Sequence, residues 1–403
     1  MATVVLLGTL DTKGTEYAFL RDCVRGHGAD VVLVDAGIMG EPRVAPDIGR
    51  EEVAAAAGSD VAALAAAGDR GAAIETMARG AAEIVQRLHA EGRLDGIAGL
   101  GGSGGSALVT QAMRALPVGV PKLMVSTVAS GDTRPYVGAT DVTMMYSVVD
   151  ISGVNRISAQ IMANAAGAIA GMANATVPPA GGDRPLIGAT MFGVTTPCVT
   201  RARERLEELG YEVLVFHATG TGGQSMEALA RGGFLAGVLD ATTTELADDL
   251  VGGVLSAGPD RLEAAGGLGL PQVVSLGAID MVNFGPLETV PPEFRDRNLY
   301  VHNPTVTLMR TTPEECAELG RRIGSKLARA TGATALFVPL KGVSMIATEG
   351  GVFHDPEADE ALFAGLRETI GDVETHWLEL DVNDEAFAGA MADRLHELVR
   401  AEA

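Results

Sequence analysis

The chain of 403 residues carries 30 Lys and Arg against 52 Asp and Glu, which gives a formal net charge of −22. A chain this acidic repels phosphate backbones, so duplex nucleic acid is not an expected partner. Hydrophobic residues make up 47% and charged residues 20%, a composition that excludes a disordered chain. At about 100–200 residues per domain, the length favours two or three domains.

Cysteine usage and hydropathy predict a reducing compartment and no membrane segment. Cys23, Cys198 and Cys316 lie far apart and form no CxxC pair, which argues against a disulfide scaffold or a four-cysteine zinc site. The first apolar run has no basic residue before Lys13, so it predicts a strand and not a signal peptide. Gln and Asn side chains interrupt the most apolar helical stretch, residues 157–175. We therefore expect a cytoplasmic protein.

The first half of the chain alternates short apolar strands with helical patterns, as βαβ units do. The expected strands are Thr3–Leu7, Asp30–Asp35, Leu94–Gly99, Pro121–Thr127 and Asp141–Val148. The expected helices are Glu16–Arg25, two within Glu51–Ala90, one after the third strand, and Ile151–Ala173. The strands are continuously apolar and do not alternate, so they predict a parallel sheet covered by helices on both faces.

A Pro- and Gly-rich linker, Thr176–Pro185, separates this half from a second one that resembles it. The second half begins with an expected strand Pro185–Thr190, a helix Cys198–Leu209 and a strand Tyr211–Phe216. Three strand segments match between the halves: those starting at Gly28 and Gly210, at Leu94 and Leu235, and at Val120 and Leu270. We expect an α/β protein with two Rossmann-like parallel-sheet domains, residues 1–178 and 184–403, related by internal duplication and meeting at a cleft.

Ligands of open parallel sheets bind beyond the carboxyl ends of the strands, so the loops there are the candidate sites. The segment Gly8-Thr-Leu-Asp-Thr-Lys-Gly14 joins hydroxyls and Lys13 to a helix N-terminus, a composition typical of a phosphate site. It fits neither GxGxxG nor GxxxxGK[ST], and an ordinary capped turn is the alternative. The candidate phosphate-binding residues are Gly8, Thr9, Asp11, Thr12, Lys13 and Gly14.

The segment Gly99–Ser106 has five Gly among eight residues, between a strand and an expected helix. Its exposed amides predict an anion nest, and a flexible surface loop is the alternative. The candidate residues are Gly101, Gly102, Ser103, Gly104 and Gly105.

A third loop, Ser126–Arg134, follows the fourth strand and offers hydroxyls, a carboxylate and a guanidinium. We expect Asp132 to hold Mg²⁺ and Arg134 to bind a phosphate. An Asp–Arg surface pair is the alternative, and Asp141 competes for the metal. The candidate nucleotide-binding residues of this loop are Ser130, Gly131, Asp132 and Arg134.

The corresponding loops of the second half carry carboxylates and amides, among them Asp240 and Glu245. We expect Asp280, Asn283 and His302 to be catalytic and to orient an acceptor, with His302 as a general base at a strand end. A hydrogen-bonded structural histidine is the alternative. The sequence contains no HxH, HExxH or GxSxG pattern, which disfavours a zinc enzyme and a serine hydrolase of the usual α/β type.

Taken together, Gly8–Gly14, Gly101–Gly105, Ser126–Asp132 and the string Arg297-Asn-Leu-Tyr-Val-His-Asn-Pro-Thr-Val-Thr-Leu-Met-Arg310 point to a known family. The chain resembles the ATP-binding family named after the tomato mosaic virus resistance protein, whose bacterial members form an uncharacterised protein family. The resemblance implies two Rossmann-like subdomains, binding of ATP with Mg²⁺ at the matched loops, and a homodimer. It does not imply an antiviral function, because the plant protein has a further C-terminal domain.

Three hypotheses remain open. The first is an ATP-dependent enzyme that transfers a phosphoryl or nucleotidyl group to a small anionic metabolite. The second is an ATP-independent hydrolase or lyase whose glycine-rich loops bind the anionic group of the substrate itself. The third is a nucleotide-sensing scaffold without turnover.

Overall fold

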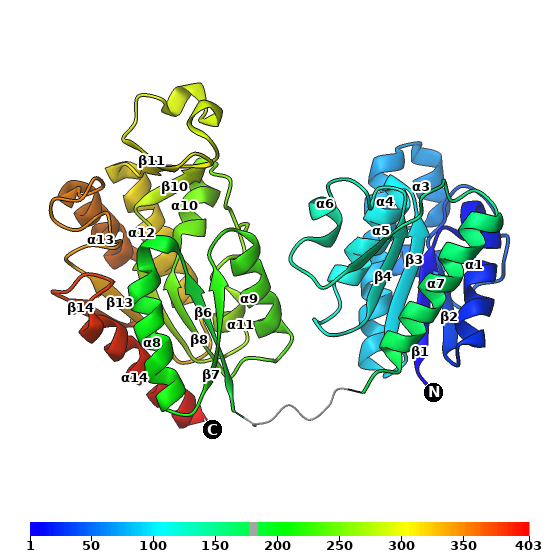
Figure 1. Ribbon diagram of the computed structural model, residues 1–403, viewed down its shortest axis with the longest axis horizontal. Helices are drawn as coiled ribbons and strands as arrows, with labels where there is room; N and C mark the ends of the chain where they lie inside the picture. The colour runs from blue at the N-terminus through cyan, green and yellow to red at the C-terminus, as the bar shows by residue number, and fades with distance from the viewer. Residues whose placement is uncertain (177–183, 403) are drawn as a thin grey trace. The chain divides into compact units, whose positions relative to one another are not determined.

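The structure is a computed structural model that describes residues 1–176 and 184–402 (Figure 1). The chain divides into two compact units, Met1–Ala180 and Gly181–Ala403, which we call the N-terminal and C-terminal units. Most of the predicted linker, residues 177–183, lies outside the described residues. Within the described ranges, no helix is long and apolar enough to cross a membrane.

The N-terminal unit is built on a five-stranded parallel sheet with the order β2-β1-β3-β4-β5. Its strands are β1 (Thr3–Gly8), β2 (Asp30–Asp35), β3 (Gly96–Gly101), β4 (Lys122–Ser126) and β5 (Thr143–Tyr146). Its helices are α1 (Leu10–Gly26), α2 (Arg50–Ala56), α3 (Val61–Ala67), α4 (Arg70–Ala90), α5 (Ser103–Arg114), α6 (Arg134–Val137) and α7 (Arg156–Ala173). The predicted parallel sheet is confirmed.

Both faces of this sheet are covered, as the continuously apolar strands predict. Along β1, Val4 and Leu6 face an apolar cluster with α1 and α7, whereas Val5 and Leu7 face one with α2, α4 and α5. The strand therefore has no solvent face, and Val4–Gly8 are buried.

The alanine-rich region 51–90 forms three helices, not the predicted two. Gly58 and Gly68 both have φ near +70° (69° and 68°), a conformation that ends a helix. Asp60 and Asp69 then start α3 and α4, because their side chains accept hydrogen bonds from backbone N–H groups of the first turns. These capping signals divide the run where hydropathy alone does not.

The C-terminal unit contains a six-stranded parallel sheet with the order β14-β13-β9-β8-β6-β7 and a separate antiparallel sheet with the order β10-β12-β11. The parallel strands are β6 (Leu186–Met191), β7 (Glu212–His217), β8 (Gly237–Thr242), β9 (Gln272–Gly277), β13 (Thr334–Pro339) and β14 (Glu374–Leu378). The antiparallel strands are β10 (Met281–Phe284), β11 (Leu299–Asn303) and β12 (Val306–Arg310).

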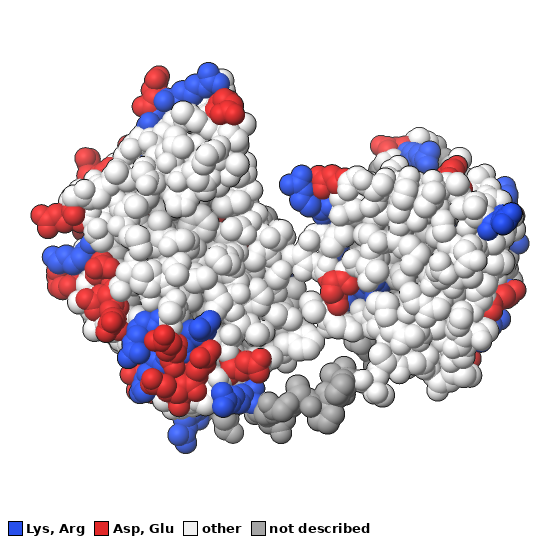
Figure 2. Space-filling view, viewed as in Figure 1, with Lys and Arg blue, Asp and Glu red and all other residues white. Residues whose placement is uncertain are grey.

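The helices of this unit also cover both faces of its parallel sheet, with α8 and α14 together on one face. They are α8 (Thr196–Glu208), α9 (Thr221–Arg231), α10 (Thr244–Val251), α11 (Ala264–Gly267), α12 (Pro313–Ala328), α13 (Pro356–Thr369) and α14 (Glu385–Glu402). Figure 2 shows mixed positive and negative side chains over α8 and α14, where arginines pair with carboxylates within and between the two helices.

The two units share strand order and register, which is what an internal duplication leaves behind. In both, the first strand of the unit lies between the second and the third, and the fourth follows. Three strand pairings correspond between the units. In the N-terminal unit they align Val4 with Val31, Val4 with Gly96, and Ile97 with Lys122. In the C-terminal unit the same three pairings align Ile187 with Val213, Ile187 with Gly237, and Val238 with Gln272.

In each unit the strand order reverses at one place, between β1 and β3 and between β6 and β8. At such a switch point the helices on the two sides leave in opposite directions, so a crevice forms at the carboxyl ends of the strands.

Candidate functional site

The switch point of the N-terminal unit is held by Tyr17 of α1. Its hydroxyl donates to the carbonyl of Leu7 on β1 and accepts from the N–H of Leu100 on β3 at 2.8 Å. Burial raises the pKa of Tyr17, so the hydroxyl stays protonated. A Cβ on Gly8 would overlap this hydroxyl. Gly8 therefore makes room for Tyr17 and does not line the cavity described below.

The predicted loop Gly8–Gly14 is mostly helix, because α1 begins at Leu10. The Leu10 N–H donates to Asp35 Oδ1 at 2.9 Å, so a carboxylate at the end of β2 fixes the start of α1. Asp11 Oδ2 accepts from the Met39 N–H at 2.7 Å and ties the turn after β2 to the same helix. Burial raises the pKa of Asp35, and the nearby Asp11 carboxylate adds to this effect.

Lys13 interrupts the first turns of α1 with a backbone conformation that is not helical (φ −118°, ψ 17°). Its ammonium donates to the carbonyl of Ile151, and Glu16 Oε1 accepts from the N–H of Gly153 at 2.6 Å. The two side chains thus anchor the segment before α7. An ammonium has three donors, so Lys13 keeps capacity for a further acceptor.

The glycine-rich segment Gly101–Gly105 contains the end of β3 and the first turn of α5. A Cβ on Gly101 would lie 2.9 Å from the Cα of Gly105, so Gly101 is required for packing. Gly102 is the N-cap of α5, and no side chain caps this helix. A Cβ on Gly102 would lie 3.6 Å from Thr127 Oγ1, which is ordinary contact. The N-terminal amides of α5 are therefore left for another acceptor.

These two segments meet at a cavity of about 480 Å³, which we call the switch-point cavity. The predicted site residues in its wall are Thr9, Asp11, Thr12, Lys13, Gly101, Gly102, Ser103, Gly104 and Gly105. Gly14 does not line it and packs instead against Arg43, whose Cβ would lie 2.8 Å from a Cβ built on Gly14. The structure thus brings together the two glycine-containing segments that the sequence singles out separately.

Sequence reasoning missed several residues of this wall, of which Arg70 and Asp150 carry charge. Arg70 begins α4, and its Nη2 lies 3.9 Å from a Cβ built on Gly104, beside the N-terminus of α5. Within the described ranges, no hydrogen bond or ion pair uses the Asp150 carboxylate. The only local signal for Arg70 is the Asp–Arg start of a helix, which does not reveal what the helix approaches.

The third predicted loop does not line the switch-point cavity. Asp132 and Arg134 form an exposed ion pair, with Nη2 2.7 Å from Oδ2, and Arg134 lowers the pKa of Asp132 to about 2. Ser130 and Gly131 are exposed beside this pair. Asp141 Oδ1 instead accepts from the buried ammonium of Lys122 at 2.8 Å. Among residues 1–176 and 184–402, no group of three or more His, Cys, Asp or Glu has a geometry that could hold a metal ion.

At the switch point of the C-terminal unit, the space between α9 and α10 is filled by the buried Arg261. Its Nη2 donates to Asp240 Oδ1 at 2.7 Å, and its Nε donates to Glu245 Oε2 at 2.6 Å. Glu245 also accepts from backbone N–H groups at the start of α9, including that of Gly220. Asp240 and Glu245 therefore belong to an internal ion network, which no local sequence pattern predicts.

The structure does not connect the three predicted catalytic residues by a hydrogen bond within the described ranges. Asp280 is buried and accepts from Ser344 Oγ at 2.8 Å, and burial raises its pKa to about 6. Asn283 is buried and donates to Asp248 Oδ2 at 2.6 Å. His302 lies exposed on the edge strand β11. Each side chain has its own surroundings, and their catalytic roles stay a prediction.

Fold and site define an α/β protein of two doubly wound parallel-sheet units, the first with a cavity at its switch point. The chain belongs to the uncharacterised protein family UPF0261: the N-terminal domain model of this family matches residues 2–178 and its C-terminal domain model matches residues 184–399. Membership of the uncharacterised family expected from the motifs is thereby confirmed, and the ATP binding that the resemblance implies stays a prediction.

Relatives extend over nearly the whole chain. A UPF0261 protein of Clostridium tetani is 57% identical over 97% of this chain and 98% of its own length. The ToMV resistance protein Tm-1(GCR237) of Solanum lycopersicum is 44% identical over 81% of this chain, a match that covers 44% of the plant protein. Among solved structures, MurG of Acinetobacter baumannii covers 100% of this chain and 98% of its own at 12% identity and a TM-score of 0.23, which carries no argument.

Proposed function

We propose that the N-terminal unit binds a phosphorylated small molecule in the switch-point cavity, with Mg-ATP as the first candidate. One observation carries this proposal: the uncapped N-terminus of α5 opens into a cavity whose wall also holds Lys13 and Arg70. Backbone amides of a first helical turn and two cations are the groups that bind phosphate oxygens.

In this proposal each group has a distinct role. The amides of Ser103, Gly104 and Gly105 donate to one phosphate, and the α5 dipole favours its negative charge. Arg70 neutralises charge from the α4 side, and Lys13 does so from α1. Glycine at positions 104 and 105 keeps side chains away from the approaching oxygens.

The described residues can bind a metal ion only together with a nucleotide whose phosphate oxygens supply further ligands. Mg²⁺ in nucleotide sites keeps several waters and takes one or two carboxylates together with phosphate oxygens. Asp150 lines the cavity and is not engaged by another described side chain, whereas Asp132 is paired with Arg134 outside it. We therefore propose Asp150, and not Asp132, as the carboxylate that approaches a nucleotide-borne Mg²⁺, to which it would add a negatively charged oxygen ligand.

Binding alone does not decide between an enzyme and a sensor. We propose a metabolic enzyme that acts on a small anionic metabolite, because phosphoryl or nucleotidyl transfer depends on charge stabilisation of the kind that Lys13 and Arg70 offer. A homodimer, which the family resemblance implies, and a cytoplasmic location, which the cysteine usage and hydropathy predict, are part of the same proposal.

Calorimetric titration with ATP, with and without Mg²⁺, tests the proposal. We expect Arg70→Ala to weaken binding at least tenfold, because a charged hydrogen bond contributes about 1.5–3 kcal/mol. Arg79→Ala is the matched control, since Arg79 is an exposed residue of the same helix outside the cavity. Failure of the unaltered protein to bind ATP or inorganic triphosphate would refute the proposal.

A further inference from the structure

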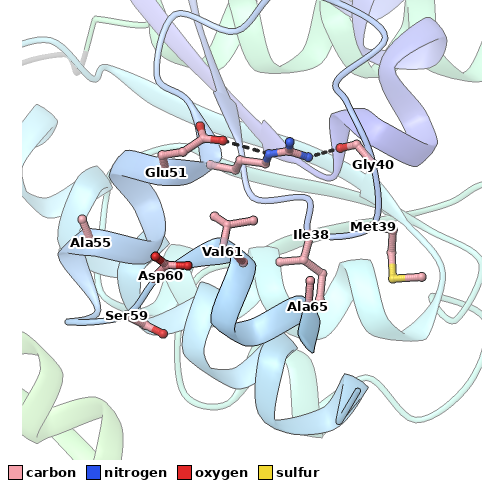
Figure 3. Close-up of a pocket in the computed structure, with 11 residues that line it drawn as sticks. Ile38, Met39, Gly40, Glu51, Ala55, Ser59, Asp60, Val61 and Ala65 are labelled. Atoms are coloured by element: carbon pink, nitrogen blue, oxygen red, sulfur yellow. Dashed lines mark hydrogen bonds and ion pairs between the residues drawn. The ribbon is translucent and has the colours of Figure 1, made fainter. Parts of the chain in front are cut away.

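A second cavity, of about 580 Å³, lies beside the switch-point cavity, and we call it the α3 cavity. Its wall comes from the turn after β2, from α2, and from α3 with the residues before it (Figure 3). Ile38 and Met39 line both cavities. The turn after β2 is therefore the boundary that the two cavities share.

The charged groups of the α3 cavity are already used within the protein. Arg50 donates to the Gly40 carbonyl and to Glu51 Oε1, the latter at 3.1 Å, as the dashed lines in Figure 3 show. A third bond joins Arg50 to Glu41 Oε1 at 2.8 Å. Asp60 caps α3 by accepting from the Ala63 N–H at 2.9 Å. A phosphate would meet two carboxylates and no free cation, so this cavity is unsuited to an anion.

The remaining wall is apolar and largely uncovered. α3 consists of seven apolar residues, none of which is buried, and the Met39 side chain is 79% exposed. In Figure 3, Val61 and Ala65 of α3 lie beside Ile38. A helix this short is marginal in water without packing, and contiguous exposed apolar surface marks binding sites. Val61 and Leu64 already pack against the core of the N-terminal unit, and an apolar ligand group would add contacts on the exposed side of α3.

We propose that the molecule bound in the switch-point cavity carries an uncharged apolar group, which binds in the α3 cavity against α3, Ile38 and Met39. This inference rests on the proposed function, because the phosphate end anchors the molecule. Only Gly68 and Asp69 separate α3 from Arg70, so one short segment contributes both the apolar wall and the cation. A flat nucleobase and an aliphatic chain share the required chemistry.

Titration of the full chain with four probes separates these possibilities. Inorganic triphosphate and ATP carry the same phosphate chain without and with an adenosine, which joins the base to the phosphates through ribose. Inorganic phosphate and octyl phosphate differ by an aliphatic chain. We expect at least one member with an apolar group to bind tenfold or more tightly than its inorganic counterpart, which equals about 1.4 kcal/mol.

Two variants on α3 assign this gain to the α3 cavity. Ala65 lines the cavity and Ala66 does not, while both are exposed, so a charged side chain is compatible with folding at either position. We expect Ala65→Glu to abolish the gain and to leave inorganic triphosphate binding unchanged. Ala66→Glu should preserve both the gain from the apolar group and the binding of inorganic triphosphate. Thermal unfolding checks that the two variants fold alike.

The outcomes distinguish the two proposals. If the inorganic probes bind and the apolar group gives no gain, or a gain that Ala65→Glu leaves intact, the inference about the α3 cavity is wrong and the phosphate site stands. If none of the four probes binds, both proposals are wrong. The pair that shows the gain identifies the apolar group as a base or as an aliphatic chain.

Discussion

A single substitution at the N-cap of α5 separates the stability of the helix from binding at the switch-point cavity. Gly102 has an extended backbone (φ −85°, ψ −159°) that any residue adopts, and a Cβ there has an ordinary contact with Thr127. Aspartate is a preferred N-cap residue, so Gly102→Asp should cap the free amides of α5 without strain.

The expected effects on folding and binding have opposite signs. At an N-cap, Asp stabilises a helix by a few tenths of a kcal/mol more than Gly does, and its negative charge near the helix N-terminus adds about 0.3–1 kcal/mol of stability. We therefore expect Gly102→Asp to unfold at a temperature about 1–4 °C higher. The repulsion between a carboxylate and a phosphate about 4 Å apart is about 1 kcal/mol in water and about 4 kcal/mol near a protein surface, so phosphate binding should weaken about fivefold or more.

Differential scanning fluorimetry and calorimetric titration with triphosphate measure the two effects. Gly102→Ala is the matched control for the added Cβ, and it should bind triphosphate normally with slightly lower stability. Gly102→Asn separates capping from charge. If Gly102→Asp binds triphosphate as well as the unaltered protein does, the amides of α5 are not the anion site.

Three further predictions concern buried polar groups. Burial raises the pKa of Asp248 to about 7 and that of Asp280 to about 6, from the ordinary aspartate value of 3.8. As the pH rises from 4 to 7, the folded state keeps these two protons while the unfolded state loses them. The free energy of unfolding should therefore fall over this range, by about 4 kcal/mol for Asp248. Denaturant titrations of Asp248→Asn should show a smaller pH dependence than those of the unaltered protein. Tyr17→Phe leaves the Leu100 N–H unpaired and should lower stability by about 1–3 kcal/mol, measured by urea unfolding. Arg261→Ala leaves buried carboxylates unpaired and should lower the free energy of unfolding by about 3–5 kcal/mol, so the C-terminal unit should unfold at a lower denaturant concentration. An unchanged midpoint would contradict the assigned network.

The fold was predictable because it depends on local patterns. Continuous apolar strands such as Asp30–Asp35 indicate a parallel sheet wherever the covering helices lie, and the matched segments at Gly28 and Gly210 indicate repeated topology. The three-way division of 51–90 was also encoded locally, in the Gly–Asp signals at 58–60 and 68–69, which apolar spacing does not reveal.

The candidate site was predictable only in part, because long-range contacts decide what a glycine or a charge does. Gly102 and Gly104 line the cavity, whereas Gly8 makes room for a tyrosine that lies nine positions later in the chain. The early start of α1 depends on Asp35, 25 residues away. Arg70 reaches the cavity from a helix whose position depends on the whole sheet. No local pattern carries this information.

The ion network of the C-terminal unit has a consequence for chemical complementation. Arg261 occupies, between α9 and α10, the place that the cavity occupies between α4 and α5 in the N-terminal unit. Three carboxylates surround this guanidinium, those of Glu227, Asp240 and Glu245. Truncating the arginine to glycine would therefore leave a negatively charged hole shaped for a planar cation. Added methylguanidine should restore the lost stability in a saturable manner, while methylammonium, which cannot donate in two parallel hydrogen bonds, should restore less. The second unit would thus become a receptor for a small cation, complementary in charge to the anion site that we propose for the first.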